Sequence, residues 1–310
     1  MLFKNHFLLA CFITVIATCL FAEEISAQQW QMVGTRKFTT GRTTLDGKNL
    51  TVVNGTPYIA YSDNTDNFNL KVMKYNGLNW VDVGPASLPI GGAGPPSITS
   101  DNGIIYIAYQ DQTYNGKNSV IKYDGTTWTF IGNRGFSPDE ARFQSIAFNN
   151  GEPYVAFEDK DSSYESSVMK YDGTNWVYLG SPGFTTGHSV GQSIYNEIAF
   201  DNGIPYVIYM SVGGSSVGPP IYETKVMKYD GTNWVPVGTT GYNNAGSANQ
   251  SIAFHNGAPY FSFLDFDYFK ATVKTFDGNN WVDVGMPGFS AGMAIQPQMV
   301  IHNGVPYVAY

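Results

Sequence analysis

The sequence predicts an all-β fold built from a repeated unit, and three features support that prediction. Every tryptophan occupies the same place in a recurring segment of the type Val168–Val177, at intervals of 50, 48, 48, 58 and 47 residues. A second recurring segment, Asn-Gly-x-Pro-Tyr, accompanies it, as at Asn150–Tyr154. The composition is rich in glycine and aromatic residues and only 14% charged, which suits an extracellular all-β protein. Repeats of this period are typical of propellers, solenoids and arrays.

Each repeat is predicted to form four short strands. In one repeat these strands are Gln144–Asn149, Pro153–Glu158, Ser167–Tyr171 and Asn175–Leu179. Asn150-Gly151 is expected to turn the first pair, because both central residues of a type I′ turn need positive φ, and Asp172-Gly173 to turn the last pair. One such sheet has two apolar faces and cannot stand alone. We therefore expect a β-propeller of four-stranded antiparallel blades, in which packing around an axis buries those faces.

The two ends of the repeat array predict six blades. Trp30–Gly34 matches a fourth strand with no first three before it, and Val305–Tyr310 matches a second strand with no third after it. We expect the N-terminal strand to close the last blade, because closure removes an exposed edge. This composite blade still lacks its third strand. We therefore also expect the sequence to be truncated at its C-terminus, in a longer protein that supplies the strand.

Residues 1–27 are predicted to be a secretory signal peptide, with Lys4, an apolar stretch from Phe7 to Phe21 and small residues before the cleavage site. The apolar stretch is short for a membrane span. Both cysteines, Cys11 and Cys19, lie inside it, so residues 28–310 can form no disulfide; lipid attachment at Cys19 stays open as an alternative. Residues 28–310 show no linker, and we expect one propeller domain that is secreted or at the cell surface, and monomeric.

The repeats also resemble a known family. Gln144–Phe157 followed by Lys170–Trp176 resembles a kelch repeat, the unit of the galactose-oxidase type of propeller. The likeness lies in the hairpin, the Tyr–Asp pair, the tryptophan near the last strand and the period, and it covers nearly all of Trp30–Tyr310. The chain departs from kelch where that family has a glycine doublet, as at Ala156-Phe157. The repeats also look like those of secreted bacterial surface proteins. The resemblance implies a β-propeller.

Four aspartates recur just after the second strand of a repeat, where the longer loops gather on one face of the predicted propeller. They are candidate ligand-binding residues, because function concentrates on loops that a rigid scaffold positions: Asp63, Asp111, Asp159 and Asp265. Capping of the strand end is the alternative. Calcium binding at Asp159–Asp161 and Asp265–Asp267 is a further alternative, because calcium prefers carboxylate ligands. No other metal and no cofactor is predicted.

A second set of candidates lies on the innermost strands, beside the predicted mouth of the central channel. Alignment of the repeats places Lys48, Gln144 and Gln250 at one equivalent position and Glu197 at the next. These positions vary, whereas Ile146 and its counterparts further along the strand do not. Amide and carboxylate groups suit sugar hydroxyls or peptide amides. Solvated strand ends without function are the alternative.

The sequence contains no Gly-x-Ser-x-Gly, His-Glu-x-x-His or phosphate-loop motif. Four arginines without a basic run, at a net charge of −8, argue against a nucleic-acid partner. We therefore predict a non-catalytic binding or scaffolding propeller for a glycan, peptide or protein ligand, and no enzyme. The alternative is a carbohydrate-active enzyme, a glycoside hydrolase or lyase that uses loop-face carboxylates, and a purely structural spacer is a third possibility. Glycosidases need two carboxyl groups about 5–10 Å apart. The sequence alone cannot show whether any two carboxyl groups lie at that distance.

Overall fold

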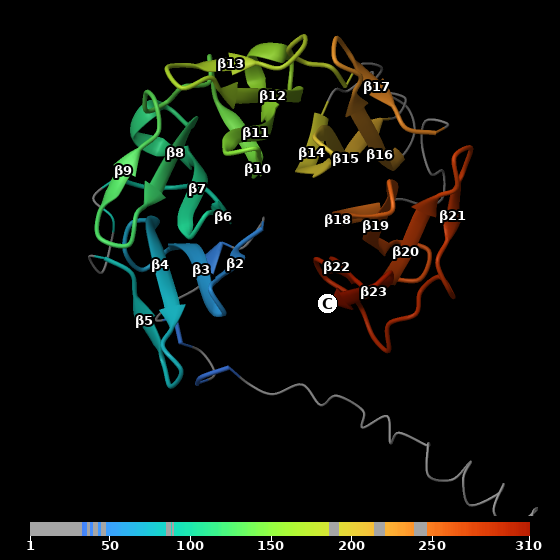
Figure 1. The fold of residues 1–310 in the computed structure, drawn as a ribbon, viewed down its shortest axis with the longest axis horizontal. Coiled ribbons are helices and arrows are strands. Elements are labelled where there is room, and N and C mark those ends of the chain that lie inside the picture. Colours follow the sequence, from blue (N-terminus) through green and yellow to red (C-terminus); the bar gives the residue numbers. More distant parts are fainter. Residues whose placement is uncertain are drawn as a thin grey trace, which may run out of the picture.

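The computed structural model describes residues 33–35, 38–39, 43–44, 48–84, 88, 90–185, 192–213, 221–238 and 247–310. Its regular structure in these residues is all β apart from two short 3₁₀ turns, Gln112–Tyr114 and Lys160–Ser162. Figure 1 shows the sheets following one another around a central axis, with the first strand of each innermost. We call these sheets blades. The predicted signal peptide, residues 1–27, lies outside the described residues.

The strands of each blade are antiparallel and follow the chain in order. Blade 1 contains β2 (Leu50–Val53), β3 (Thr56–Asp63), β4 (Asn69–Tyr75) and β5 (Trp80–Asp82), and the short β1 (Thr43–Thr44) also pairs with β3. Blade 2 contains β6 (Ser97–Asp101), β7 (Ile104–Asp111), β8 (Lys117–Tyr123) and β9 (Trp128–Phe130). Blade 3 contains β10 (Ala141–Asn149), β11 (Glu152–Asp159), β12 (Glu165–Tyr171) and β13 (Trp176–Tyr178).

Two further blades also contain four strands each, and a sixth sheet contains two. Blade 4 contains β14 (Gln192–Asp201), β15 (Ile204–Gly213), β16 (Ile221–Tyr229) and β17 (Trp234–Pro236). Blade 5 contains β18 (Ser247–His255), β19 (Ala258–Asp265), β20 (Lys270–Phe276) and β21 (Trp281–Asp283). The sixth sheet pairs β22 (Gln298–His302) with β23 (Val305–Ala309).

The turns form as the sequence predicts. Asn150 and Gly151 have φ values of 51° and 81°, and the Asn-Gly turns of the other repeats have the same left-handed pair. At the opposite pair of strands, the Asp172 carboxylate accepts hydrogen bonds from the backbone N–H of Thr174 and of Asn175, both at 2.8 Å. The aspartate therefore stabilises the turn by bonding its own backbone.

The tryptophans join each blade to the one before it. The Trp176 indole N–H donates to the carbonyl of Ile131 in blade 2 at 2.9 Å, and the Phe136 ring stacks on the indole at 4.3 Å. The same indole bond recurs from Trp80 to Val33, from Trp128 to Val83, from Trp234 to Leu179 and from Trp281 to Val237. These contacts confirm that the repeated tryptophans pack between blades.

The ring of blades has one open side, between the sixth sheet and blade 1 (Figure 1). Val33 and Phe38 contact Trp80 as a preceding fourth strand would, but Trp30 lies outside the described residues. The closure of a sixth blade by the N-terminal strand, and the number of blades, therefore remain predictions.

The stacked tryptophans provide a test of this packing. We expect Trp176→Ala to lower the free energy of unfolding by about 3–5 kcal/mol, because a large buried aromatic side chain is removed. Trp80→Ala should cost less, because Trp80 lies beside the open side and is only partly buried. Urea denaturation of both variants measures the two losses. A loss below about 1 kcal/mol for Trp176→Ala would contradict this role for the tryptophan.

Candidate functional site

The innermost strands converge on a small cavity at the centre of the ring. Its volume is about 50 Å³. Side chains from blades 1, 3, 4 and 5 and from the sixth sheet line it: Lys48, Phe143, Gln144, Ser145, Tyr195, Asn196, Glu197, Asn249, Gln250, Gln296 and Gln298. Four sequence candidates, Lys48, Gln144, Glu197 and Gln250, therefore lie together here. A void of this size holds about three to five water molecules.

A β-bulge turns these side chains toward the centre. In blade 3 the register of β10 against β11 shifts between Arg142 and Ser145, so that one extra residue is accommodated. Phe143 in that bulge has a φ of 49°, and Tyr195, Asn249 and Gln296 are also left-handed in the corresponding places. Non-glycine residues in this region are strained and cluster at functional sites. Sequence analysis missed these four residues, because neither a bulge nor a single left-handed residue changes the alternation of side chains that a sequence shows.

The amide side chains of the cavity fasten neighbouring first strands together. Gln250 donates through Nε2 to the Tyr195 carbonyl at 2.8 Å, and Gln144 donates in the same way to the Pro95 carbonyl. The Gln250 Oε1 atom is buried, and no described residue donates a hydrogen bond to it. A buried acceptor without a donor is costly, so this atom is suited to a hydroxyl or water in the cavity.

Glu197 is the one carboxylate among the described residues that line the cavity. Burial raises the pKa of its carboxyl group, and the Lys48 ammonium 3.6 Å away opposes that rise. The Lys48 side chain is 47% exposed and the Glu197 side chain 8%. A half-exposed lysine is screened by solvent and compensates only part of the cost of burying the charge.

Three other blades show what structure alone requires at the Glu197 position. Ser97, Ser145 and Ser251 occupy it, and the hydroxyl of each accepts a hydrogen bond from the first-strand backbone of the next blade, as from Ile198 N to Ser145 Oγ at 3.2 Å. Glu197 Oε2 accepts the equivalent bond from Ile252 N at 3.4 Å. Its other oxygen faces Lys48. A serine meets the structural need, so the carboxylate is an addition specific to blade 4.

Two aromatic rings also line the cavity. The Phe143 and Tyr195 rings are 5.1 Å apart between centroids and are tilted by 57°. Both come from the strained bulges of blades 3 and 4, and both line the cavity. The arrangement combines an apolar surface, amides, a lysine and one buried acid.

The four recurring aspartates lie elsewhere. Each is at most 1% exposed and caps the backbone that leaves the second strand: Asp63, Asp111, Asp159 and Asp265. None lines the cavity. The ligand-binding interpretation of these residues is therefore corrected to capping, the alternative that the sequence left open. Among the residues that the structure describes, no group of three or more His, Cys, Asp or Glu could hold a metal ion.

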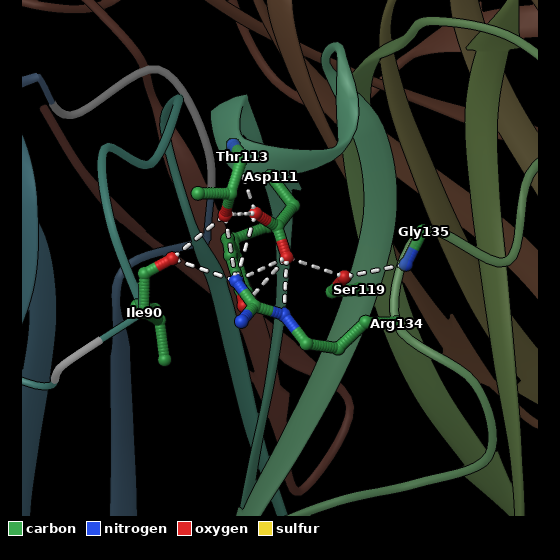
Figure 2. A network of polar contacts seen from close by, with 7 residues as sticks. Ile90, Asp111, Thr113, Ser119, Arg134 and Gly135 are labelled. Atoms are coloured by element: carbon green, nitrogen blue, oxygen red, sulfur yellow. Dashed lines mark hydrogen bonds and ion pairs between the residues drawn. The ribbon is translucent and has the colours of Figure 1, made fainter.

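Figure 2 shows one of these caps in full. The Asp111 carboxylate accepts from Ser119 Oγ at 2.8 Å, from Thr113 N at 3.2 Å and from the Arg134 guanidinium at 2.9 and 3.0 Å. Arg134 also donates to the Ile90 carbonyl at 2.6 Å. The carboxylate is thus fully used by the fold.

The other caps differ in their partners. Asp63 pairs with Lys71 at 2.8 Å, and although burial acts to raise the pKa of its carboxyl group, the bonds from Lys71 and Thr65 hold it at about 2. Asp159 accepts a hydrogen bond from Tyr178 OH at 2.8 Å. Burial raises the pKa of Tyr178, and this bond raises it further. Burial raises the pKa of Asp265.

Glu158 is a buried acid outside the cavity. It is 1% exposed, and no described residue donates to its Oε2 atom. Burial raises the pKa of its carboxyl group to about 7, against the pull of Arg142 and with the help of Glu140. The alternation of polar and apolar residues in its strand gave no signal that this glutamate would be buried.

The chain matches known proteins in its fold and not in its sequence. No protein-family model matches the chain. No curated protein matches it in sequence. Among solved structures it is similar to an α-L-arabinofuranosidase from Fusarium graminearum, with a TM-score of 0.59 and 12% identity over 83% of this chain and 84% of the other. The fold is a β-propeller.

Two other similar structures have different functions. One is the SapL1 lectin in complex with α-methyl fucoside, with a TM-score of 0.56 and 16% identity over 84% of this chain and 86% of the lectin. The other is an ulvan lyase, with a TM-score of 0.54 and 15% identity over 84% of this chain and 78% of the lyase. No helix in the described part of this chain is long and apolar enough to cross a membrane.

These comparisons correct the functional prediction. The sequence favoured a non-catalytic binding module, and no enzyme. The similar propellers include a hydrolase and a lyase, and this finding contradicts the prediction of a non-catalytic module.

The capping role of Asp111 can be tested by removing its carboxylate. We expect Asp111→Ala to lower the free energy of unfolding by about 3–5 kcal/mol, because Arg134 and Ser119 lose a buried partner. Urea denaturation measures the loss. Asp101→Ala, at the partly exposed end of β6 in the same blade, serves as a control that should change stability little. Equal stability of the two variants would contradict the capping role.

Glu158 should make stability depend on pH. Its folded-state pKa of about 7 lies above its ordinary value of 4.5, so between these values the unfolded chain loses the proton first. Stability should therefore fall as pH rises through this window, by up to about 3 kcal/mol. Unfolding of the wild type and of Glu158→Gln at pH 5 and pH 8 checks this. The difference between the two proteins should shrink at pH 5, and a constant difference would contradict the prediction.

Proposed function

We propose that this protein is a carbohydrate-active enzyme whose active site is the central cavity, with Glu197 as the group that transfers a proton. One observation carries the proposal. Glu197 places a buried carboxylate where three other blades have serine, and its second oxygen faces the half-exposed Lys48 ammonium at 3.6 Å. A buried carboxyl group with a raised pKa and a specific charged partner in a cavity is a candidate active-site residue.

The chemistry of glycosidic bond cleavage fits such a residue. Both hydrolysis and elimination deliver a proton to the oxygen that leaves; water replaces that oxygen in hydrolysis, and loss of a ring proton with formation of a C=C bond balances it in elimination. The described lining holds one carboxylate, so Glu197 would supply the acid and not the second carboxyl group that most glycosidases use. A carboxyl group whose pKa is raised by burial keeps its proton at a higher pH and can donate it. Lys48 limits the rise, because its positive charge favours the carboxylate form. The pair can therefore adjust the pH range in which Glu197 acts as an acid.

The rest of the cavity is suited to holding a sugar. Gln250 Oε1, to which no described residue donates, can accept a hydrogen bond from a hydroxyl group. Phe143 and Tyr195 offer an apolar surface for the C–H face of a ring. A volume of about 50 Å³ admits one edge of a sugar, so the bond to be cleaved would lie at the mouth of the cavity.

The other parts of the sequence interpretation belong to the same proposal. A signal peptide at residues 1–27 would place the enzyme outside the cell, where polysaccharides are found. Repeats that resemble kelch would make the propeller one of the galactose-oxidase type. We infer a monomer that acts on an extracellular glycan.

The proposal is tested by screening the protein against plant and algal polysaccharides and aryl glycosides. Reducing-end assays detect hydrolysis or elimination, and absorbance of the unsaturated product identifies elimination. We expect Glu197→Gln to lower kcat on the substrate found by about 10²–10⁴-fold, because the proton donor is lost. Glu197→Ser, which restores the residue of the other blades, should lose activity equally and melt no lower than the wild type. Glu152→Gln, an exposed carboxylate of blade 3, is the matched control.

The pH profile gives a second measurement on the same substrate. Lys48→Gln removes the charge that opposes the raised pKa of Glu197. The pKa should rise further, and the alkaline limb of the profile should move to higher pH. Cleavage of no substrate by the wild type, or retention of more than half of the activity by Glu197→Gln, would overturn the proposal.

A further inference from the structure

A groove lies between blades 2 and 3, at the hairpin end of their first two strands. Its volume is about 240 Å³. Residues of both blades line it, among them Tyr106 and Lys122 of blade 2 and Phe148, Pro153 and Tyr171 of blade 3. Phe148 lies on β10 four residues beyond Gln144, which is roughly 13 Å at about 3.3 Å per residue. The groove is therefore separate from the central cavity.

Blade 3 shows which group the recurring tyrosine and lysine of the repeat bind together. Tyr154 and Lys170 are the equivalents of Tyr106 and Lys122, because each pair lies opposite across the second and third strands. Glu152 Oε2 accepts a hydrogen bond from Tyr154 OH at 3.0 Å and lies 3.6 Å from the Lys170 ammonium. A tyrosine and a lysine in this arrangement therefore hold one carboxylate.

In blade 2 the described chain supplies no carboxylate to this pair. Ile104 stands at the position of Glu152, two residues before the tyrosine. No described residue bonds to Tyr106 OH or forms an ion pair with Lys122. Burial, and then the charge of Asp101, raises the pKa of Tyr106, but no hydrogen bond joins the two residues. The hydroxyl and the ammonium can therefore bind a carboxylate of another molecule.

The groove is larger than a carboxylate alone requires, and its walls are aromatic. The Phe148 ring lies 4.2 Å from the Tyr106 ring between centroids, and Phe148 and Tyr171 are both partly exposed. The volume is about eight times that of a water molecule, at roughly 30 Å³ each. Aromatic walls with a few polar groups are typical of sites for small ligands, in which the polar groups fix the orientation.

We propose that this groove binds a hexuronate, a six-membered sugar ring that carries a carboxylate. The carboxylate would lie between Tyr106 OH and the Lys122 ammonium, as that of Glu152 does in blade 3, and the C–H face of the ring would pack on Phe148 and Tyr171. Charge-assisted hydrogen bonds supply specificity for the acid. The site is distinct from the proposed active site and requires no cleavage of the ligand.

The experiment uses the 310-residue protein and three probes. Isothermal titration with methyl β-D-glucuronide should show saturable one-to-one binding. Methyl β-D-glucoside is the matched neutral probe and should bind at least tenfold more weakly, because the tyrosine and the lysine lose their charged partner. Sodium acetate, which has the carboxylate but no ring, should also bind at least tenfold more weakly.

Two protein variants locate the site. Lys122→Gln should weaken binding of the glucuronide at least tenfold, because the positive charge is lost. Ile104→Glu should have the same effect, because it supplies from within the chain the carboxylate that Glu152 supplies in blade 3. Lys170→Gln is the matched control and should keep the affinity of the wild type, because this lysine is already paired with Glu152.

Blade 4 provides a second control. Its Tyr206 and Lys228 also lie opposite each other, and Ile204 precedes the tyrosine by two residues. Lys228→Gln should keep the affinity of the wild type, because the proposed ligand lies between blades 2 and 3. No saturable binding, equal affinity for the glucuronide and either other probe, wild-type affinity of Lys122→Gln or Ile104→Glu, or an equal loss in Lys228→Gln would each overturn the proposal.

Discussion

The packing of one blade against the next is the interaction on which the rest of the molecule depends. A four-stranded blade has two apolar faces, and neither can be buried within the blade itself. The tryptophans solve part of this problem, because each indole donates to a carbonyl of the preceding blade and carries an aromatic or apolar neighbour between the sheets. Since every blade is oriented by its neighbour, the first strands all face the same axis, and the side chains that line the cavity come from blades far apart in sequence.

The central cavity contains features that this packing between blades does not require. The first strands could continue as regular ladders, but bulges at Phe143, Tyr195 and Asn249 hold bulky residues in left-handed conformations. Gln250 has a buried oxygen that no described residue satisfies, and Glu197 keeps a carboxyl group out of water. Each of these features costs free energy. In the buried caps, by contrast, donors match every aspartate carboxylate.

Much of the fold could be predicted from the sequence because the repeat shows each local rule several times. Asn150-Gly151 and Asp172-Gly173 report turns that depend only on neighbouring residues, and the recurring tryptophan reports a contact with the blade one repeat earlier. The candidate site was predicted in part: alignment placed Gln144, Glu197 and Gln250 near the axis, but not the bulge residues beside them. A bulge is decided by pairing between strands, which no single segment records. Asp111 and its counterparts were misassigned to a ligand surface for a related reason, because burial depends on Arg134 and other distant partners.

Comparing the bonding partners of equivalent residues in different blades separates structural from functional positions better than sequence variation among the repeats does. The capping aspartates also vary in their surroundings, since Asp63 uses Lys71, Asp111 uses Arg134 and Asp159 uses Tyr178. In each case the partner changes and the same bond to the backbone survives, so the variation is neutral for the fold. At the Glu197 position the backbone bond also survives, from Ile252, but an ionisable group is added that a serine would not bring. This repeat keeps its structural bond and adds a buried carboxylate that faces Lys48 at the axis. The proposed proton-transfer role would account for that addition.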